Sequence, residues 1–420
     1  MIQTFQLQPG ITLRCFPDNR FKQGLLSVQF LRPMKKDEAA LNAIIPTILL
    51  RGTRSAPDLR AITLRLDDLY GAAVGCVVRR IGDYQTTGLQ MRFISDRYAM
   101  DGDKILEPSI EFLGQLLFDP LLENGSFPKG FVSGEKRNLI AAIEAQRNDK
   151  RAYCNGRLLK KLCAKDSYGI PRLGSVSQVR KITPRAAYDH YRKVLRESPV
   201  EIFYVGEADP TQVADLLKKL FSQVERSCAQ LPPQTPLQPA NPSDYTETME
   251  VSQGKLAMGF VTPVTIRDAD FAAMQVCNAI FGGGMTNLLF MNVREKLSLC
   301  YDIGSAYHGS KGLVTVSAGI DPDKFDLVKG QVLAQLEALS TENFTEEIFQ
   351  AAKQGILSSL AGVHDSPGGI EGYYASGALS GQKMTPEQYA DAVRSVTRQQ
   401  VAACAKGLQL HTTYFLKGVQ

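Results

Sequence analysis

The 420-residue sequence is poor in the side chains that most often bind metal ions. Its only histidines are His190, His308, His364 and His411. No two of these lie close enough in the sequence to share one helix face, so each is expected to be a surface or packing residue. Eight scattered cysteines include no C-x-x-C pair, a pattern that favours reduced, buried thiols over disulfides or a zinc knuckle.

Other absences exclude whole classes of protein. No stretch approaches the roughly 18 consecutive apolar residues of a membrane span. The beginning, MIQTFQLQPGITLRCF, lacks the basic start and apolar run of a secretory signal. Lysine and arginine exceed the acids by only five (48 − 43), too few over this length to indicate a nucleic-acid partner. A cytoplasmic globular protein with no membrane span and no nucleic-acid partner is expected.

Nucleophile and phosphate-binding motifs are also missing, because the chain has neither a G-x-S-x-G sequence nor a P-loop. What the chain does have is length, enough for two domains or more. Between residues 227 and 243 the sequence SCAQLPPQTPLQPANPS carries five prolines, which favour an extended connector. The predicted organisation is an N-terminal half at 1–226, a linker at 227–243 and a C-terminal half at 244–420.

The two halves carry the same pattern. LSVQFLRPM in the first and LAMGFVTPV in the second align at an offset of 230 residues, which matches Pro33 with Pro263 (263 − 33). The same offset takes Gly52 to Gly282, each at the end of an apolar helical run. Each half is predicted to begin with an alternating strand, a turn and a buried helix. The fold class is therefore α+β, two homologous halves whose mixed or antiparallel sheets are backed by helices.

Residues 281–301, FGGGMTNLLFMNVREKLSLCY, resemble the second-half signature of the pitrilysin/insulinase family of zinc peptidases, which includes the mitochondrial processing peptidases. Three further segments resemble successive landmarks of that family, so the likeness covers nearly the whole chain: LDDLYGAAVG, DSYGIPRLGSVSQVRKIT and YVGEADPTQVADLL. The resemblance implies two homologous halves that enclose a cavity with a partner. It is nearest to small bacterial metal-free members that pair with an active subunit.

The metal-binding motif of the family is erased. Members read approximately L-x-H-x-x-E-H-x-L-F-x-G-T where this chain reads LNAIIPTILLRGT. The match puts Ala43 and Thr47 at the two zinc-binding histidines and Pro46 at the catalytic glutamate. In a later segment beginning at Glu135, the third ligand position falls on Ala142. A zinc site needs three such protein ligands, so this chain is expected to bind no cofactor, with zinc in a partner subunit.

Pro46 carries a physical argument of its own. A proline inside a helix removes a backbone donor and clashes with the preceding turn, at a cost of roughly 3 kcal/mol. The helix is therefore predicted to start near Pro46 or to kink there.

The motif of the second half is kept. Arg294 and Tyr301 are seven residues apart (301 − 294), along one helix face if the helix continues or across its end if it breaks. In active members of the family, an arginine and a tyrosine at this spacing bind the substrate and stabilise the oxyanion, a task that suits a guanidinium and a phenol. The alternative is an ion pair and a capped tyrosine. Gly282, Gly283 and Gly284 permit positive backbone angles and close approach of another chain, whether a peptide or a packed helix, and are assigned to the substrate chamber. The alternative is a turn before a helix at 285–296.

The lost zinc-binding motif and the retained arginine/tyrosine motif together predict that the active site is shared between this chain and a partner. The chain is not a peptidase alone; the resemblance implies that it forms a heterodimer with a homologous H-x-x-E-H zinc subunit. It would supply Arg294 and Tyr301 in trans and half of a chamber for a peptide substrate, and a homodimer is possible when it is alone. The alternative function is a pseudo-peptidase that binds or scaffolds a peptide without hydrolysis.

Overall fold

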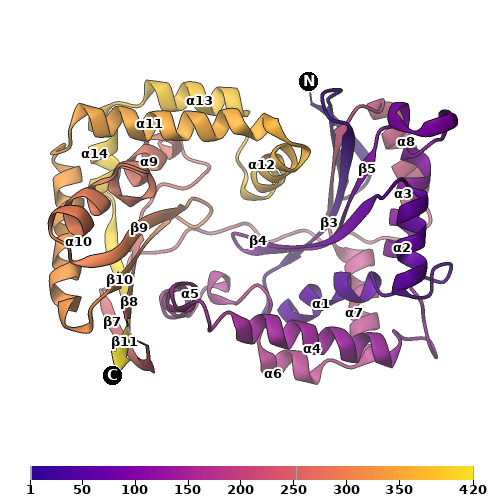
Figure 1. Cartoon of the computed structure of the whole chain (residues 1–420), viewed down its shortest axis with the longest axis horizontal. Coiled ribbons are helices and arrows are strands. Elements are labelled where there is room, and N and C mark those ends of the chain that lie inside the picture. Colours follow the sequence, from indigo (N-terminus) through magenta and orange to yellow (C-terminus); the bar gives the residue numbers. More distant parts are fainter. Residues whose placement is uncertain (1, 252, 420) are drawn as a thin grey trace. The chain divides into compact units, whose positions relative to one another are not determined.

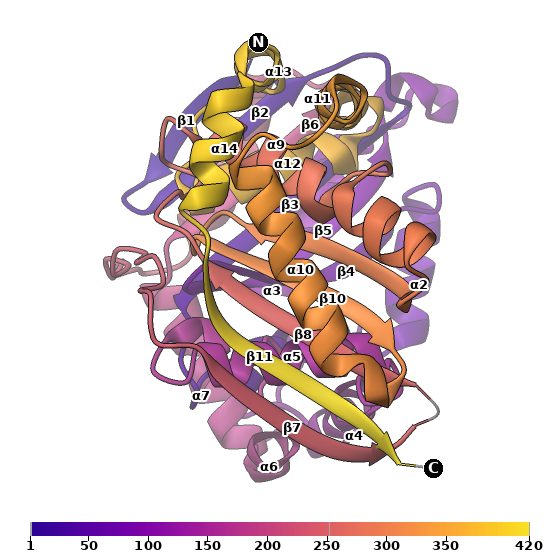
Figure 2. The same ribbon diagram turned by 90° about the vertical axis from the view of Figure 1, so that its left-hand side faces the viewer.

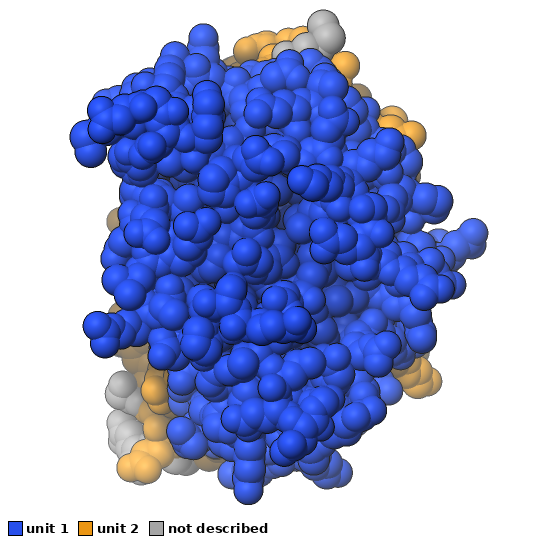
Figure 3. Space-filling model, turned by 90° about the vertical axis from the view of Figure 1, so that its right-hand side faces the viewer, with its two compact units in different colours: residues 1–144, 170–233, 364–376 blue, residues 145–169, 234–363, 377–420 orange. Residues whose placement is uncertain are grey.

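A computed structural model describes residues 2–251 and 253–419. The chain forms two compact units (Figure 3). Unit 1 comprises residues 1–144, 170–233 and 364–376, and unit 2 comprises residues 145–169, 234–363 and 377–420. The change from one unit to the other at 233/234 lies within the proline-rich segment, and residues 225–242 are in neither helix nor strand.

Unit 1 is built on a six-stranded sheet in the order β1-β2-β6-β3-β5-β4. Figure 1 labels β3, β4 and β5 of this sheet. Its strands are β1 (Gln3–Gln8), β2 (Ile11–Pro17), β3 (Gln23–Pro33), β4 (Ala73–Ile81), β5 (Tyr84–Ile94) and β6 (Val200–Gly206). The β2/β6 pair is parallel and the other pairs are antiparallel. The sheet is therefore mixed, and β4 is an edge strand.

Seven helices accompany this sheet: α1 (Ala39–Leu49), α2 (Leu59–Asp68), α3 (Leu106–Phe118), α4 (Lys129–Ala145), α6 (Val176–Lys181), α7 (Pro184–Glu197) and α8 (Pro210–Phe221). Local sequence explains where several of them begin. The side chains of Thr183 and Asp209 cap α7 and α8, each followed by proline at the first helical position, where its missing N–H costs nothing. Apolar side chains of α1, α3, α7 and α8 pack with those of the strands in one continuous core.

Unit 2 is built on a five-stranded sheet in the order β7-β11-β8-β10-β9. Figure 2 shows β7, β11, β8 and β10 side by side, with α10 across their near face. The strands are β7 (Ser243–Glu250), β8 (Gly254–Val261), β9 (Cys300–His308), β10 (Leu313–Ile320) and β11 (Gln409–Val419). The β7/β11 pair is parallel, the rest are antiparallel, and β9 is an edge strand.

The remaining helices are α5 (Lys150–Leu162), α9 (Phe271–Asn278), α10 (Phe325–Ser340), α11 (Glu346–Ala361), α12 (Pro367–Ser380), α13 (Pro386–Ser395) and α14 (Arg398–Lys406). Two π-helical segments, η4 (Ala279–Gly283) and η5 (Leu289–Lys296), flank the glycine-rich turn. No helix among the described residues combines the length and the apolar character that a membrane span requires.

The two sheets repeat one plan. The order β2-β6-β3-β5-β4 in unit 1 corresponds strand by strand to β7-β11-β8-β10-β9 in unit 2, with the same pair parallel. The segments aligned in the sequence form β3 and β8, which occupy equivalent central positions. The predicted α+β fold with two homologous halves is therefore confirmed.

Each unit also takes one segment from the other half of the sequence. In unit 2, α5 packs on β8 and β11, and its Leu158 belongs to one buried cluster with Ala257 and Tyr414. In unit 1, Glu371 of α12 accepts a hydrogen bond from Gln29 of β3 at 2.7 Å. The polar face of β3 is consequently buried as well as its apolar face, because α12 contributes a partner for it.

Candidate functional site

The erased metal motif lies on α1, which packs against β4 and β5 of unit 1. Ala43 is 3% exposed. Thr47, one turn later, is half-buried, and its hydroxyl donates to the carbonyl oxygen of Ile44 at 2.8 Å. A methyl group cannot coordinate zinc, and the hydroxyl is engaged by its own helix. These two positions therefore do not fit a zinc ion.

Helix α1 runs through Pro46 instead of starting there. It begins at Ala39, so of the two predicted alternatives a helix start near Pro46 is wrong, and a kink there stays a prediction. Because proline has no N–H, the carbonyl group of Asn42 loses its helical partner. The buried hydroxyl of Thr87 on β5 donates to that carbonyl oxygen at 2.7 Å. The sheet thus supplies the hydrogen bond that the proline removes, and the helix can continue.

The third ligand position is equally unsuited to zinc. Ala142 on α4 is exposed. Glu135, two turns earlier, is 6% exposed, lies 3.6 Å from the Arg51 guanidinium and accepts from the Asn138 amide at 3.3 Å. This surviving carboxylate is therefore paired within unit 1. Among residues 2–251 and 253–419, no group of three or more His, Cys, Asp or Glu side chains is arranged to hold a metal ion.

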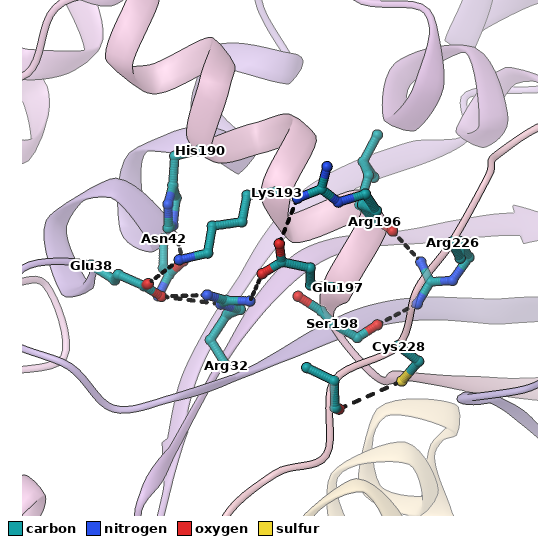
Figure 4. A network of polar contacts seen from close by, with 12 residues as sticks. Arg32, Glu38, Asn42, His190, Lys193, Arg196, Glu197, Ser198, Arg226 and Cys228 are labelled. Atoms are coloured by element: carbon teal, nitrogen blue, oxygen red, sulfur yellow. Dashed lines mark hydrogen bonds and ion pairs between the residues drawn. The ribbon is translucent and has the colours of Figure 1, made fainter.

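One histidine does lie beside α1. His190 of α7 is buried, and its Nε2 donates to the side-chain oxygen of Asn42 at 2.7 Å (Figure 4). The Asn42 amide donates in turn to Gln85 at 2.9 Å. Burial lowers the pKa of His190 to about 4; the charge of Glu38 opposes this shift, and the charges of Arg32 and Lys193 add to it. His190 is therefore a neutral packing residue at neutral pH, as expected for the histidines of this chain.

The neighbouring acid Glu38 is held as a carboxylate. Lys193 donates to one of its oxygens at 2.8 Å and Arg32 donates to the other at 2.7 Å (Figure 4). Burial by itself would raise the pKa of Glu38, but these two hydrogen bonds outweigh it and lower the pKa to about 2. The polar groups around α1 thus form a satisfied structural cluster.

In unit 2, Arg294 and Tyr301 lie on either side of a helix end. Segment η5 ends at Lys296, and Tyr301 is the second residue of β9. Of the two predicted arrangements, the one across the end of a broken helix is therefore confirmed. The Arg294 guanidinium lies 4.7 Å from the centre of the Phe290 ring and 3.6 Å from Glu295. The Tyr301 side chain is 54% exposed, and its hydroxyl donates to Asp321 at 3.0 Å.

Tyr301 keeps its hydroxyl hydrogen, which it donates to Asp321. The hydrogen bond to Asp321 raises the pKa of Tyr301 from its ordinary value, so the phenol stays protonated at physiological pH. Burial raises the pKa of Cys300 to about 11, with Asp302 adding to the rise and the Arg294 charge opposing it, which places Arg294 within electrostatic range of the start of β9. Arginine stays charged throughout.

The three glycines are required by close packing within unit 2. A Cβ at Gly282 would lie 2.8 Å from the backbone nitrogen of Ser305, and one at Gly284 would lie 2.8 Å from the carbonyl oxygen of Ala279. Gly283 is similarly crowded, and none of the three has a positive φ. The interpretation from positive backbone angles is therefore wrong, and the close approach is to their own chain.

The helix predicted for 285–296 begins later than expected. Met285 is 98% exposed in the turn, and η5 starts at Leu289. The reason is Asn287, whose side-chain oxygen accepts from the Phe290 backbone N–H at 2.8 Å and so fixes the first turn.

A pocket of ≈ 380 Å³ adjoins the glycine turn, entirely within unit 2. Its lining includes Gly282 and Gly284, the strand residues Gly304 and Ser317, and two side chains of α5, Arg151 and Asn155. Sequence reasoning missed Arg151 and Asn155. Only their four-residue spacing could have suggested a shared helix face, and nothing in the sequence places α5 beside β9 and β10.

Comparison with known proteins identifies the family. Residues 181–356 match the family described as "Peptidase M16 inactive domain". The chain is 30% identical over 411 residues to a Bacillus subtilis protein, covering 98% of this chain and 96% of the relative. With the fold and the erased metal motif, this shows that the chain belongs to the M16 (pitrilysin/insulinase) peptidase family, among its inactive members.

The B. subtilis relative is named "Probable inactive metalloprotease YmfF". A crystal structure of a conserved protein from Enterococcus faecalis V583 superposes with a TM-score of 0.92 and 26% identity, covering 100% of this chain and 99% of that one. An M16 inactive domain from Pseudomonas fluorescens gives a TM-score of 0.82 at 18% identity, covering 100% and 98%. The same architecture is thus found along the whole chain.

Proposed function

We propose that this protein is the metal-free subunit of a heterodimeric peptidase. Its partner is a homologous H-x-x-E-H subunit that binds the zinc ion, and the two together form a chamber for a peptide substrate. The proposed location is the cytoplasm. When it is isolated, the chain can associate as a homodimer.

One contrast carries the proposal. In unit 1, the positions of the family's zinc ligands are occupied by Ala43, Thr47 and Ala142, which do not fit a zinc ion. In unit 2, Arg294 and Tyr301 keep the family's spacing and are both accessible. The chain keeps the two side chains that would contact the substrate and lacks the residues that would bind zinc. This combination favours a role in a reaction that takes place at the zinc site of a partner.

The chemistry assigned to the two side chains is electrostatic. A zinc ion held by the partner would supply activated water for attack on a peptide carbonyl, and negative charge would then develop on the carbonyl oxygen. Tyr301 can donate its hydroxyl hydrogen to that oxygen after leaving Asp321, and Arg294 can bind the adjacent substrate carbonyl. Neither group needs to change its charge state to do so.

The first test is to identify what binds the protein. A tagged chain is purified from its native cells at low salt, co-purifying proteins are identified by mass spectrometry, and zinc is assayed in the complex. An equimolar H-x-x-E-H homologue with about one zinc per pair is expected. Recovery of the chain alone, or with unrelated proteins and no zinc, would favour the peptide-binding or scaffolding function instead.

The second test addresses Tyr301 in the assembled complex. Tyr301→Phe should lower kcat of peptide cleavage by roughly one to three decades, because it removes a donor that acts on the transition state. Complex formation, followed by size-exclusion chromatography, should be unchanged. Tyr245→Phe, another partly exposed tyrosine of unit 2, is the matched control and should cleave normally. Unchanged turnover of Tyr301→Phe would rule out action in trans.

A further inference from the structure

The sheet of unit 2 lacks a strand that unit 1 has. Strand β2 of unit 1 corresponds to β7 of unit 2, and β1 pairs with the outer edge of β2 in the antiparallel direction. Among the described residues, no strand pairs with the outer edge of β7, which lies at the border of its sheet (Figure 2). Six of the eight residues of β7 are exposed. Its outward N–H and C=O groups are therefore open to another strand.

The charges of β7 do not protect this edge, although charged side chains often prevent strand pairing. The strand, SDYTETME, contains Asp244, Glu247 and Glu250. Lys329 of α10 lies 2.6 Å from Asp244, and Arg157 of α5 lies 2.9 Å from Glu247. Two of the three acids are thus neutralised within unit 2. The threonine and tyrosine residues between the acids favour an extended strand.

A second copy of β7 fits this edge because the acids avoid one another in one register. When a two-fold axis relates two antiparallel strands of one sheet, facing residues lie on the same face, so their numbers have an even sum. Two such registers pair seven residues, with sums of 492 (243 + 249) and 494 (244 + 250). The sum of 494 places Glu247 opposite itself and Asp244 opposite Glu250, which is unfavourable. The sum of 492 places Thr246 opposite itself and no acid opposite another acid.

The same register brings opposite charges together. It places Glu247 of the other copy opposite Tyr245 (245 + 247 = 492). The ammonium group of Lys161 on α5 lies 4.4 Å from the centre of the Tyr245 ring. Each Glu247 carboxylate therefore lies beside a positive charge of the other copy, and the two-fold axis repeats the contact. The contact uses the Tyr245 ring and not its hydroxyl group.

We propose that β7 of one chain pairs with β7 of a second copy in the antiparallel direction, with Thr246 on the two-fold axis. The two five-stranded sheets then form one continuous sheet. The proposal rests on the proposed function only for the association of the isolated chain with itself, and it adds the surface that is used. Because each cross-strand pair contributes little, a weak dimer with a Kd on the order of 10–100 μM is expected.

Sedimentation velocity of the isolated chain, at concentrations below and above the expected Kd, measures this association. Thr246→Glu should weaken it roughly tenfold or more, because two carboxylates then face each other at the axis. Thr246→Lys should have the same effect with two ammonium groups. An equimolar mixture of the two variants should restore the dimer, since glutamate then faces lysine.

Two controls separate pairing from folding. Thr246 is exposed, so neither substitution should lower Tm appreciably. Thr63→Glu, at an exposed position on α2 of unit 1, adds the same charge away from β7 and should associate as the wild type does.

Three results would overturn the proposal: a wild type that stays monomeric, variants that dimerise like the wild type, and variants that stay monomeric when mixed. If the wild type is monomeric and Thr246→Glu no longer binds an H-x-x-E-H subunit, the edge binds the zinc subunit instead of a second copy. The heterodimer is tested separately. If Thr246→Glu still co-purifies with that subunit and the complex cleaves peptides, a failure of self-association leaves the heterodimer unaffected.

Discussion

His190 is hydrogen-bonded to α1, the helix that carries the metal ligands in active relatives. It is nevertheless a packing residue. Its Nε2 hydrogen is committed to Asn42, and burial keeps the ring neutral. In the folded state the pKa is about 4, below the ordinary value of 6.5. The folded chain therefore binds fewer protons at this residue than the unfolded chain between these two pH values.

This difference predicts how stability depends on pH. The contribution of neutral His190 is complete above pH 6.5 and is lost progressively as pH falls towards 4. Between pH 7 and pH 5 the wild type should lose about 2 kcal/mol more unfolding free energy than His190→Gln, whose side chain does not titrate. Urea denaturation at both pH values measures it. Parallel losses in the two proteins would show that His190 does not resist protonation.

At the scale of elements, α1 and α12 both depend on the sheet of unit 1. Helix α1 passes through Pro46 because Thr87 of β5 satisfies the Asn42 carbonyl. Helix α12 covers the polar face of β3, where the buried carboxylate of Glu371 accepts from Gln29 and from both terminal nitrogens of Arg79. In each case a hydrogen bond from another element decides whether the local sequence can be accommodated.

A double-mutant cycle tests the first case. Thr87→Val should destabilise the protein by about 1–3 kcal/mol, because the Asn42 carbonyl is left buried and unpaired. In a Pro46→Ala background the alanine N–H takes over that carbonyl, so the same change should cost less. Unfolding free energies from urea titration give the coupling. Thr63→Val, on an exposed threonine of α2, is the control and should change stability by less than about 0.5 kcal/mol. If the effects of Thr87→Val and Pro46→Ala on the unfolding free energy were strictly additive, the Thr87 hydroxyl would not be the partner of the Asn42 carbonyl group.

At the scale of the whole molecule, each compact unit includes a segment from the other half of the sequence. Unit 2 takes residues 145–169, which carry α5, and unit 1 takes residues 364–376, which carry most of α12. The units are therefore not independent domains connected only by the proline-rich segment. Leu158 and Leu162 of α5 are buried against the sheet of unit 2 and would be exposed to water without it.

This exchange predicts that the halves fold only together. Fragments 1–233 and 234–420, expressed separately, should each lack a stable fold, because each sheet loses a covering helix. When mixed during refolding they should form a stoichiometric complex with the circular dichroism spectrum of the intact chain, and size-exclusion chromatography would detect it. Two separately folded, monodisperse fragments would contradict the prediction.

The sequence by itself determined the repeated α+β plan and the replacement of the family's zinc-binding residues. The loss of the ligands followed from side-chain chemistry, because Ala43 and Ala142 offer no ligand atom in any fold. The family motif around Arg294 and Tyr301 also made them candidates, although the sequence could not say that the helix between them ends.

Only the tertiary structure decided how Pro46 is tolerated, why the three glycines are needed and which side chains of α5 line the pocket. Thr87 is 45 residues from its acceptor Asn42, and Arg151 is 166 residues from its acceptor Ser317. Local propensity and periodicity describe neighbours along the chain, whereas partners this distant are chosen by packing. Burial then makes each unpaired polar group costly, so it is the packed fold that assigns a role to each of these side chains.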